Sequence, residues 1–431
     1  MRGHGGIDMN ITELRNYIEQ DGLQSFFHDF YFGEADLQKD RYQKAIRSFE
    51  KEFGLQDLSI FSAPGRTEIG GNHTDHQHGE VLAASINKDA IAIVAATEDG
   101  RISLVSGEDP LLQIDAADLA VKEEEKNTTA SLIRGVAAGM KERGFKVGGF
   151  KAYVTSDVLI GAGLSSSAAF ETLLGNIFSY LYNDGSVSAV EIAKIGQYAE
   201  NVYFGKPCGL MDQMACSVGS LVHIDFADPE KPQFEKVDYD FAARGYHLCI
   251  TDTKGSHADL TPDYAAVPAE MRSVAEYFGK NVLHEVGEEE VVKNISVLRE
   301  KCGDRAVLRA LHFYEENKRV QKEVQALKKD DVEAFLQAVS ASGASSFQFL
   351  QNVYTNHDVA HQNVSVALQL AEMVLQGRGA ARVHGGGFAG TMQAWVPEDL
   401  VDAYKAQMDA VFGNGACSVL WIRSCGGMRV I

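Results

Sequence analysis

The sequence predicts an α+β fold, because its strands and helices form separate groups along the chain. Short β-rich runs gather between residues 59 and 158 and return near the C-terminal end, whereas long helical periodicities dominate residues 265–377. The regular strand–helix alternation of a doubly wound parallel sheet is missing. The chain has 431 residues, long enough for two or three domains. A shift in composition after residues 228–232 places a boundary near 230–245 and predicts domains over 1–235 and 236–431.

In the first half of the chain, hydrophobic periodicity separates helices from strands. The run at 91–95 is too apolar to be anything but a buried strand, and the strand at 59–63 is expected to end at Pro64-Gly65. Ser188 followed by Glu191 is a capping-box pattern that starts a helix. The apolar stripe of that helix consists of Ile192, Ile195, Ala199 and Val202. The other elements expected here are helices over 11–20, 38–53 and 167–182, and strands over 102–105 and 150–158.

The second half of the chain is expected to be mainly helical. A final pair of strands is expected to close it, over 393–396 and 419–423. Long helices are expected near 265–279, 303–328, 331–350 and 358–377.

Composition and charge exclude several classes of protein. Hydrophobic residues make up 45% of the chain and charged residues 23%, so disorder, collagen-like repeats and a disulfide scaffold are not expected. A formal net charge of −20 repels phosphate backbones and anionic lipid, which argues against nucleic acid or a membrane as partner. No apolar run is long enough to cross a bilayer, and no signal peptide is expected. The six cysteines lack zinc-site spacing, so reduced thiols and a cytoplasmic location are expected.

The stretch GAGLSSSAA at 161–169 follows an expected strand and opens an expected helix. Glycines let the backbone approach a ligand, and the free N–H groups of a helix start attract an anion. Serine hydroxyls can donate to phosphate oxygens or ligate Mg²⁺. An ordinary capped helix would explain an isolated G-x-G, but the three serines and two alanines favour a phosphate-binding loop. It is not a Walker loop, because no Lys-Ser or Lys-Thr follows the glycines.

A second stretch, at 63–79, concentrates glycines, histidines, carboxylates and Arg66. It is not expected in a core, because too many polar groups would lack partners. A solvated loop and the lining of a polar pocket both remain open. A metal site at His73, Asp75 and His76 is disfavoured, because the helical i, i+4 histidine spacing and a cysteine ligand are missing. The preferred interpretation is a hydrogen-bonding surface for a polyhydroxylated ligand, with Arg66 free to meet phosphate.

Two further stretches are weaker signals. The glycine-rich RVHGGGFAGT at 382–391, expected between a helix and a strand, implies close approach of the backbone to a ligand or only to another loop. The stretch CGLMDQ at 208–213 places Asp212 among small and apolar residues. Taken alone, Asp212 is explained most simply as a buried, hydrogen-bonded structural residue.

Together these four stretches resemble the GHMP kinase superfamily and, within it, the galactokinases. The G-R…H-T-D loop, the G-x-G-L-S-S-S-A-A loop, the C-G-x-M-D-Q segment and the G-G-G-F-x-G segment occur in that order and cover nearly the whole chain. The resemblance implies a two-domain α+β GHMP kinase fold with the active site in the inter-domain cleft. It also implies a sugar 1-kinase that uses ATP and Mg²⁺, with a sugar and ATP as small-molecule partners. A monomer or weak homodimer is expected.

The resemblance also implies residue roles, carried over position by position. Asp212 matches the catalytic aspartate, and Arg66 matches the arginine that keeps it ionised and stabilises the transferring phosphoryl group. Glu200 matches the Mg²⁺ glutamate; the serine ligand comes from the three serines of the loop, and Ser167 is assigned here. The implied sugar-binding residues are Asn72, His73, Asp75, His76 and Tyr264. The implied ATP-binding residues are Gly161, Gly163, Leu164, Ser165, Ser166, Ser167 and Ala168.

The chemistry fits these roles independently of the resemblance. Phosphoryl transfer depends mainly on positioning and charge neutralisation. A carboxylate beside the attacking hydroxyl can accept its proton, and a nearby guanidinium lowers the pKa of that carboxylate and keeps it a base near neutral pH.

The sequence departs from the galactokinase pattern near the sugar. The usual R-V-N-L-I-G-E is RTEIGGN at 66–72, so Asn72 replaces a glutamate that lies near the C6 hydroxyl in that family. His76 replaces a tyrosine, Leu159 a proline and Ala389 a glycine. A neutral amide would not repel a C6 carboxylate, so galacturonate, or another C6- or C2-modified galactose-like sugar, stands beside galactose as a candidate. A non-catalytic sugar sensor and a kinase of mevalonate or homoserine are further alternatives. The complete SSSAA loop argues against the sensor, and the H-T-D pair argues for a sugar.

Overall fold

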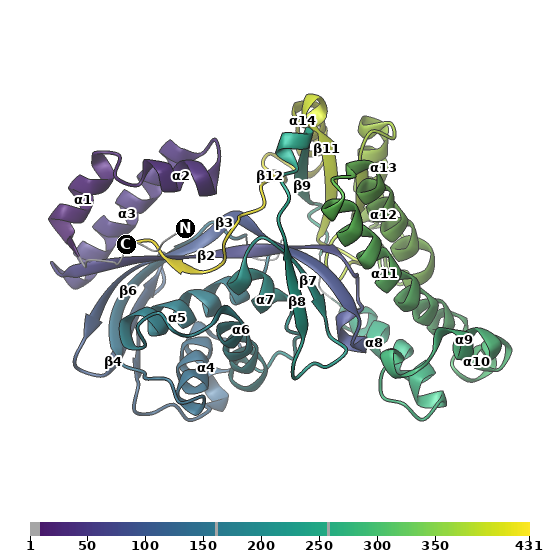
Figure 1. The fold of residues 1–431 in the computed structure, drawn as a ribbon, viewed down its shortest axis with the longest axis horizontal. Coiled ribbons are helices and arrows are strands. Elements are labelled where there is room, and N and C mark those ends of the chain that lie inside the picture. Colours follow the sequence, from purple (N-terminus) through teal and green to yellow (C-terminus); the bar gives the residue numbers. More distant parts are fainter. Residues whose placement is uncertain (1–8, 160–162, 257–258) are drawn as a thin grey trace.

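The structure of the chain is a computed structural model that describes residues 9–159, 163–256 and 259–431. In these residues the strands form two sheets, one of nine strands and one of four. Helices cover both faces of the larger sheet at one end of the molecule and surround the smaller sheet at the other (Figure 1). The predicted α+β class is therefore confirmed.

Two long, buried strands form the centre of the larger sheet. They pair antiparallel along most of their length, with Phe61 opposite Ala92. The first of them runs on through Pro64 and Gly65, so the prediction that it ends there was wrong. Shifts in register after Pro64 and after Glu68 let it bend and continue to the polar loop. The strands of this sheet are β1 (Met9–Asn10), β2 (Asp57–Gly70), β3 (Glu80–Thr97), β4 (Arg101–Ser106), β5 (Leu112–Asp115), β6 (Gly149–Ser156), β7 (Leu221–Asp225), β8 (Gln233–Val237) and β13 (Met428–Arg429).

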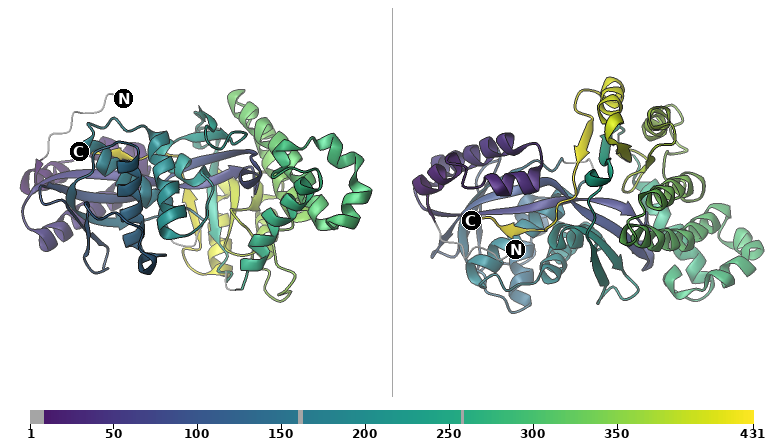
Figure 2. Two further views of the ribbon diagram at one scale, coloured as in Figure 1. Left: turned by 90° about the horizontal axis from the view of Figure 1, so that it is seen from below. Right: turned by 45° about the horizontal axis from the view of Figure 1, so that its top comes forward.

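The helices of residues 11–53 cover one face of this sheet, and those of residues 129–218 cover the other (Figures 1 and 2). The first group buries aromatic side chains such as Phe27, Tyr42 and Phe49 against β2 and β3. The second group buries Leu173, Ile177 and their neighbours. The helices are α1 (Ile11–Glu19), α2 (Gln24–Tyr31), α3 (Ala35–Phe53), α4 (Thr129–Glu142), α5 (Ser166–Tyr182), α6 (Ala189–Tyr198) and α7 (Met211–Val218).

Helix α6 begins as predicted but ends differently. The Ser188 side chain accepts a hydrogen bond from the backbone N–H of Glu191 and so caps the helix. From Ala199 to Phe204 the chain continues as a π-helical segment. The wider turn breaks the 3.6-residue period, so Val202 is 41% exposed instead of completing the predicted stripe, while Glu200 is buried.

In the smaller sheet the strand order is β10-β11-β9-β12, and all neighbours are antiparallel. The predicted final strands both exist, but each pairs with β9 between them rather than with the other. The glycine-rich stretch lies between strands β10 and β11, not between a helix and a strand as predicted. The strands are β9 (Tyr246–Asp252), β10 (Ala380–Val383), β11 (Thr391–Pro397) and β12 (Cys417–Leu420).

The helices of the second half confirm the expected helical character. Helices α2, α4, α7, α9, α10 and α14 were not predicted. Helices α9 and α10 are too short and too charged to show a clear period. The helices are α8 (Thr261–Tyr277), α9 (Glu288–Lys293), α10 (Ile295–Lys301), α11 (Asp304–Lys328), α12 (Val332–Ser345), α13 (Asn363–Leu375) and α14 (Val401–Phe412).

A buried ion cluster ties the two ends of the chain to the larger sheet. Asp89 of β3 is fully buried and accepts hydrogen bonds from Tyr31 at 2.7 Å and from Arg41 at 2.7 Å. Arg423, also fully buried, lies 3.2 Å from the same carboxylate. Residues 425–431 then pack with α1–α3, where the C-terminus lies close to the N-terminal helices (Figure 1).

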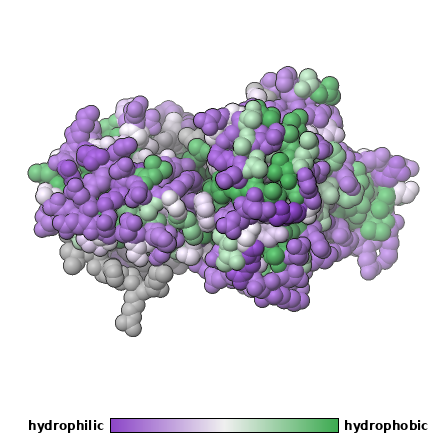
Figure 3. All heavy atoms as spheres, turned by 90° about the horizontal axis from the view of Figure 1, so that it is seen from above, coloured by the Kyte–Doolittle hydropathy of each residue, from purple (hydrophilic) through white to green (hydrophobic). Residues whose placement is uncertain are grey.

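The surface reflects the acidic composition. On the face seen from above, hydrophilic residues cover most of the molecule, and hydrophobic residues gather near the middle, above the smaller sheet (Figure 3). Among the described residues, every helix is too short or too polar to span a membrane. All six cysteines are free thiols, and Cys216, Cys249 and Cys417 are buried.

Candidate active site

Arg66 and Asp212 meet at the centre of the candidate site. Arg66 lies on β2 just after its first register shift, and Asp212 is in the first turn of α7. Arg66 Nε donates to Asp212 Oδ1 and Nη2 donates to Oδ2, both at 2.7 Å. This is a bidentate pair, the strong form of such an interaction. The Arg66 side chain is 9% exposed and that of Asp212 is 29% exposed, so the carboxylate is held on one side and accessible on another.

The serine turn before α5 approaches the same carboxylate. The Ser165 hydroxyl donates to Asp212 Oδ2, and Arg66 donates a further hydrogen bond to the carbonyl of Gly163. Ser165 has a φ of 56°, in the left-handed region that non-glycine residues seldom adopt. The structure therefore brings residues 66, 163, 165 and 212 together.

The environment keeps the Asp212 carboxylate ionised. Burial raises its pKa, but the charge of Arg66 and the hydrogen bonds from Arg66 and Ser165 outweigh burial and hold the pKa below the usual range. Asp212 is thus a carboxylate at neutral pH and can accept a proton from a bound hydroxyl.

The remaining loop residues predicted to bind ATP differ in what they can offer. Gly161 lies outside the described residues. Leu164 and Ala168 are buried, so a ligand could meet only their backbone. Ser166 and Ser167 are partly exposed and begin α5, where the first N–H groups of a helix have no intrahelical partner. This end of α5 can therefore present N–H and O–H donors to an anion.

Ser167 and Glu200 offer oxygen ligands for a metal ion. The Ser167 hydroxyl donates to Glu200 Oε1 at 3.1 Å, and Lys206 Nζ lies 3.1 Å from the same oxygen. Lys206 is 61% exposed, so a cation is already drawn to this position and could be displaced. The described residues contain no group of three or more His, Cys, Asp or Glu side chains placed to hold a metal. Two hard protein oxygens nevertheless suit Mg²⁺, which takes its other ligands from phosphate and water.

Glu171 is a neighbour that sequence reasoning missed. It is fully buried on α5, one turn after Ser167, and its Oε1 has no hydrogen-bond partner among the described residues. Gln213 Nε2 donates to both Glu171 at 3.0 Å and Glu200 at 2.9 Å. Burial, reinforced by the charge of Glu200, raises the pKa of Glu171 well above its usual range. The sequence signal that could have identified Glu171 is its position four residues after Ser167, on the apolar side of α5.

Asn72 lies behind the site, with its amide fully used by the protein. It is fully buried, and its Nδ2 donates to Glu68 Oε1 at 3.0 Å and to the carbonyl of Gly385 at 2.7 Å. Its Oδ1 accepts from Asn352 Nδ2 at 2.8 Å and from the Ser346 hydroxyl at 3.2 Å. No atom of this side chain is left for a ligand, which differs from the expectation that Asn72 contacts the sugar directly.

His73, Asp75 and His76 lie on the polar loop and are each partly exposed. His73 Nδ1 is 3.3 Å from His76 Nε2, and its Nε2 is 3.0 Å from the carbonyl of Gly386. Burial lowers the pKa of His73 to about 4 and that of His76 well below its usual range, so both rings are neutral at pH 7. Burial raises the pKa of Asp75 to about 6. The loop therefore offers neutral rings and one weakly acidic carboxylate.

Tyr264 approaches from the opposite side of the loop. It lies on α8, and its hydroxyl donates to the carbonyl of Gly387 at 2.8 Å. Its ring packs edge-on against Phe388. The glycine-rich stretch thus contacts both the polar loop, through Gly385 and Gly386, and Tyr264.

Residues 66–72 are buried, which corrects the expectation that this polar segment stays out of a core. Their polar groups find partners in the second half of the chain. Arg382 Nη2 donates to Glu68 Oε1 at 2.5 Å, the Gly71 N–H donates to Glu316 Oε1 at 3.2 Å, and His312 Nε2 lies 2.9 Å from the Asn72 carbonyl. Such long-range partners leave no trace in the local sequence.

Comparisons with known proteins show to which family the chain belongs. Residues 131–220 match the family described as "GHMP kinases N terminal domain", and residues 47–96 match the "Galactokinase galactose-binding signature". A galactokinase of Glaesserella parasuis is 30% identical over 83% of this chain and 90% of its own length. A galactokinase of Streptomyces coelicolor is 31% identical over 85% of this chain and 92% of its own. The chain belongs to the galactokinase family of GHMP kinases.

Solved structures extend the likeness of this galactokinase-family chain to the fold. Lactococcus lactis galactokinase complexed with galactose matches with a TM-score of 0.74 and 25% identity, over 89% of this chain and 98% of that one. Methanococcus jannaschii mevalonate kinase has a TM-score of 0.61 at 15% identity, over 84% of this chain and 98% of that one, and shares the fold alone. As a member of the galactokinase family, the protein is a sugar kinase, a phosphotransferase.

Within the galactokinase pattern, two side chains have exchanged places. The usual amide and carboxylate of that pattern fall at positions 68 and 72, where this chain has Glu68 and Asn72. The two side chains are hydrogen-bonded to each other at 3.0 Å. A carboxylate is therefore retained behind the loop, although paired with Arg382.

Proposed function

We propose that this chain transfers the γ-phosphoryl group of ATP to the anomeric hydroxyl of galactose. The bidentate Arg66–Asp212 pair beside the serine turn is the observation that carries the proposal. Asp212 is ionised and 29% exposed, so it can accept the proton of the C1 hydroxyl. Arg66 holds that carboxylate in place and stabilises charge on the transferring group. The relatives are named galactokinases, and the Lactococcus lactis galactokinase structure is a complex with galactose, which supports galactose as the substrate.

ATP and Mg²⁺ are proposed to bind at the start of α5. The N–H groups and hydroxyls of the serine turn, from Ser165 to Ser167, would hold phosphate oxygens. Ser167 and Glu200 would hold the Mg²⁺, whose bound charge offsets that of the phosphates. Lys206, 3.1 Å from Glu200, would be displaced from that carboxylate and turn toward the phosphates. These local charges overcome the overall charge of −20.

The sugar is proposed to bind against the polar loop. Asp75 would accept hydrogen bonds from sugar hydroxyls, and the neutral rings of His73 and His76 can each donate or accept. Tyr264 would close the pocket from α8. Asn72 is proposed as a positioning residue that holds the glycine-rich stretch against the loop.

Galacturonate is the second candidate, and Arg272 is the observation that favours it. Arg272 lies on α8, is exposed, and has no ion pair or hydrogen bond among the described residues. The pKa of His76 is lowered by burial, by His73 and, third in size, by the charge of Arg272. Arg272 therefore lies near the predicted sugar loop. A free guanidinium there could pair with a C6 carboxylate.

A coupled ADP-release assay over galactose, galacturonate, N-acetylgalactosamine, arabinose and glucose tests both candidates. We expect turnover with galactose to exceed that with the other sugars. Preference for galacturonate that is lost in Arg272→Gln, with galactose turnover unchanged, would select the second candidate. Absence of ADP release with every sugar, from folded protein with Mg²⁺ present, would refute the proposed function.

A further inference from the structure

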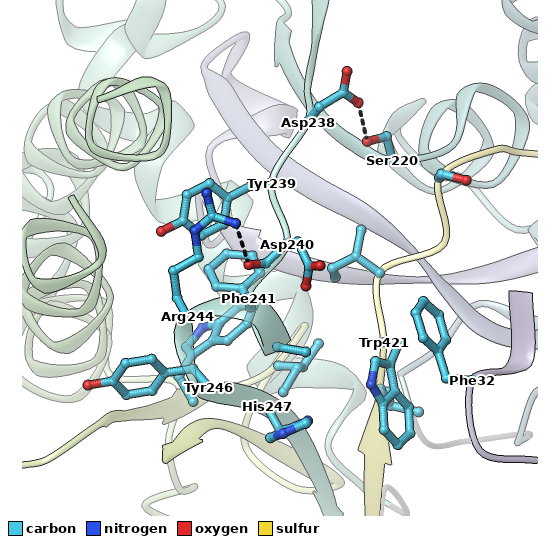
Figure 4. Close-up of a pocket in the computed structure, with 16 residues that line it drawn as sticks. Phe32, Ser220, Asp238, Tyr239, Asp240, Phe241, Arg244, Tyr246, His247 and Trp421 are labelled. Carbon is cyan, nitrogen blue, oxygen red and sulfur yellow. Dashed lines mark hydrogen bonds between the residues drawn. The ribbon is translucent and has the colours of Figure 1, made fainter. Parts of the chain in front are cut away.

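A second cavity lies where the chain passes between the two sheets. Among the described residues the chain makes this passage twice, between β8 and β9 at 238–245 and between β12 and β13 at 421–427. The cavity has a volume of about 480 Å³, within the range of small-molecule sites. It is lined by residues of both passages and by Phe32, which follows α2 (Figure 4). We call it the crossover pocket; it shares no residue with the candidate active site.

Aromatic side chains form two walls of the crossover pocket. On one side, the Phe241 ring lies 4.7 Å from Tyr239 and 4.0 Å from Trp395, centre to centre. On the other side, Trp421 and Phe32 are stacked at 5.6 Å with 14° between their planes. Figure 4 shows the two walls facing each other across the cavity, with Asp240 between them. Large flat faces of this kind attract apolar groups and cations.

The charge at the mouth of the pocket is negative. Asp238 Oδ1 accepts from the Ser220 hydroxyl at 3.2 Å, and Asp240 Oδ1 accepts from the Ala243 N–H at 3.0 Å. The second oxygen of each carboxylate has no hydrogen-bond partner among the described residues. Both carboxylates can therefore turn toward a ligand.

The one arginine that lines the cavity does not cancel this charge. Arg244 Nε is 2.8 Å from Asp330 Oδ1, and its guanidinium lies over the Tyr239 ring at 4.7 Å. Its charge is thus paired with Asp330, although its Nη1 also donates to the backbone carbonyl of Asp240 at 3.1 Å. An anionic ligand would meet two unpaired carboxylates, whereas a cation would meet carboxylates and aromatic faces together.

Trp395 contributes to the wall of the pocket. Trp395 is fully buried, lines the cavity, and its indole N–H has no hydrogen-bond partner in the described structure. Buried tryptophan N–H groups usually find a partner. Because that nitrogen has no exposed surface, it is not available to a ligand in the pocket.

We propose that the crossover pocket binds a small organic cation, an ammonium group carried on an apolar body. The aromatic walls take the apolar part and the face of the cation, and Asp238 and Asp240 take its charge. Such a ligand touches both passages at once. Because the two sheets carry opposite parts of the candidate active site, it would fix how these parts are held relative to each other.

The chain offers a built-in reporter for this proposal. It has two tryptophans, and both line the crossover pocket. Titration with choline, read by tryptophan fluorescence without ATP or sugar, tests binding independently of the kinase reaction. The control ligand is the uncharged isostere of choline, in which carbon replaces the quaternary nitrogen. We expect a saturable change with choline and about fivefold weaker binding of the isostere.

Two matched variants locate the charge. Asp240→Asn keeps an oxygen for the Ala243 N–H and should weaken choline binding about fivefold while leaving the isostere unaffected. Asp109→Asn, an exposed change far from the pocket, should alter neither. Equal binding of choline and its isostere, or no saturable change with choline, would overturn the proposal. Unchanged choline binding in Asp240→Asn would remove Asp240 from the site and with it the proposed cation recognition.

Discussion

Replacing Asp212 by Asn tests the centre of the proposed mechanism. The amide keeps one oxygen to accept from Arg66, but it loses the charge and one of the two hydrogen bonds at 2.7 Å. It can no longer take a proton from a sugar hydroxyl at neutral pH. Loss of a positioned base typically costs about 10²–10⁴-fold in rate, so kcat should fall by that amount. The sugar Kd should stay within about threefold, because substrate contacts outside Asp212 remain.

The same change has a smaller effect on stability. Breaking a fully buried pair costs about 3–5 kcal/mol, and an exposed pair contributes about 0–1 kcal/mol. The side chains of Arg66 and Asp212 are 9% and 29% exposed, which places the expected loss near 1–2 kcal/mol. Asp399→Asn is the control, because Arg378 and Asp399 also form a bidentate pair, through Nη1 and Nη2, on the surface. It should leave both activity and stability nearly unchanged.

The assay is steady-state ADP release at saturating ATP and sugar, with sugar binding followed by calorimetry and unfolding by urea. A kcat within threefold of the unmodified protein, in a folded Asp212→Asn variant, would show that Asp212 is not the proton acceptor. If sugar binding were lost in parallel with kcat, Asp212 would instead be a sugar-binding residue, and its proposed role as the proton acceptor alone would be refuted.

Three further outcomes are expected. Burial raises the pKa of Asp75 to about 6, so its ionised form is lost as pH falls through that value. The sugar KM should therefore rise below pH 6 while kcat stays level. A KM that does not change with pH would contradict this. Glu200→Gln should raise the Mg²⁺ concentration needed for half-maximal rate about tenfold, measured by metal titration of activity. Burial raises the pKa of Glu323 well above its usual range, and neither carboxyl oxygen has a partner in the described structure. The native state therefore keeps a proton that the unfolded chain releases above pH 4.5, so stability falls as pH rises, by about 1.4 kcal/mol per unit up to the native pKa. Glu323→Gln removes this loss: its free energy of unfolding should match the unmodified protein near pH 4 and exceed it at pH 8, and an equal difference at both pH values would refute the assignment.

The sequence alone was sufficient for prediction where the residues that indicate a feature are neighbours in the chain. The three serines and two alanines at 165–169 predicted a loop before a helix, and the structure brings Ser165 to Asp212 and Ser167 to Glu200. The fold class followed from the grouping of strands and helices. The division into 1–235 and 236–431 stays a prediction; residues 425–431 pack with the N-terminal helices.

Sequence reasoning failed where distant residues determine local structure. The segment 66–72 was judged too polar for a core because its partners lie 240 or more residues away; they are Arg382, Glu316 and His312. Val202 was misplaced because a π-helical segment has no signature in hydrophobic period. Asn72 was expected to contact the sugar, and only the four hydrogen bonds around it show that its amide is already used.

The Asp89 cluster has a consequence for how the protein is made. Arg423 is synthesised 334 residues after the aspartate that it helps to neutralise. A ribosome therefore exposes the whole N-terminal layer long before its last ion partner and strand β13 emerge. Until then Arg41 is the one basic side chain among the described residues that balances the Asp89 carboxylate of β3. This layer is thus completed only after translation has passed residue 429.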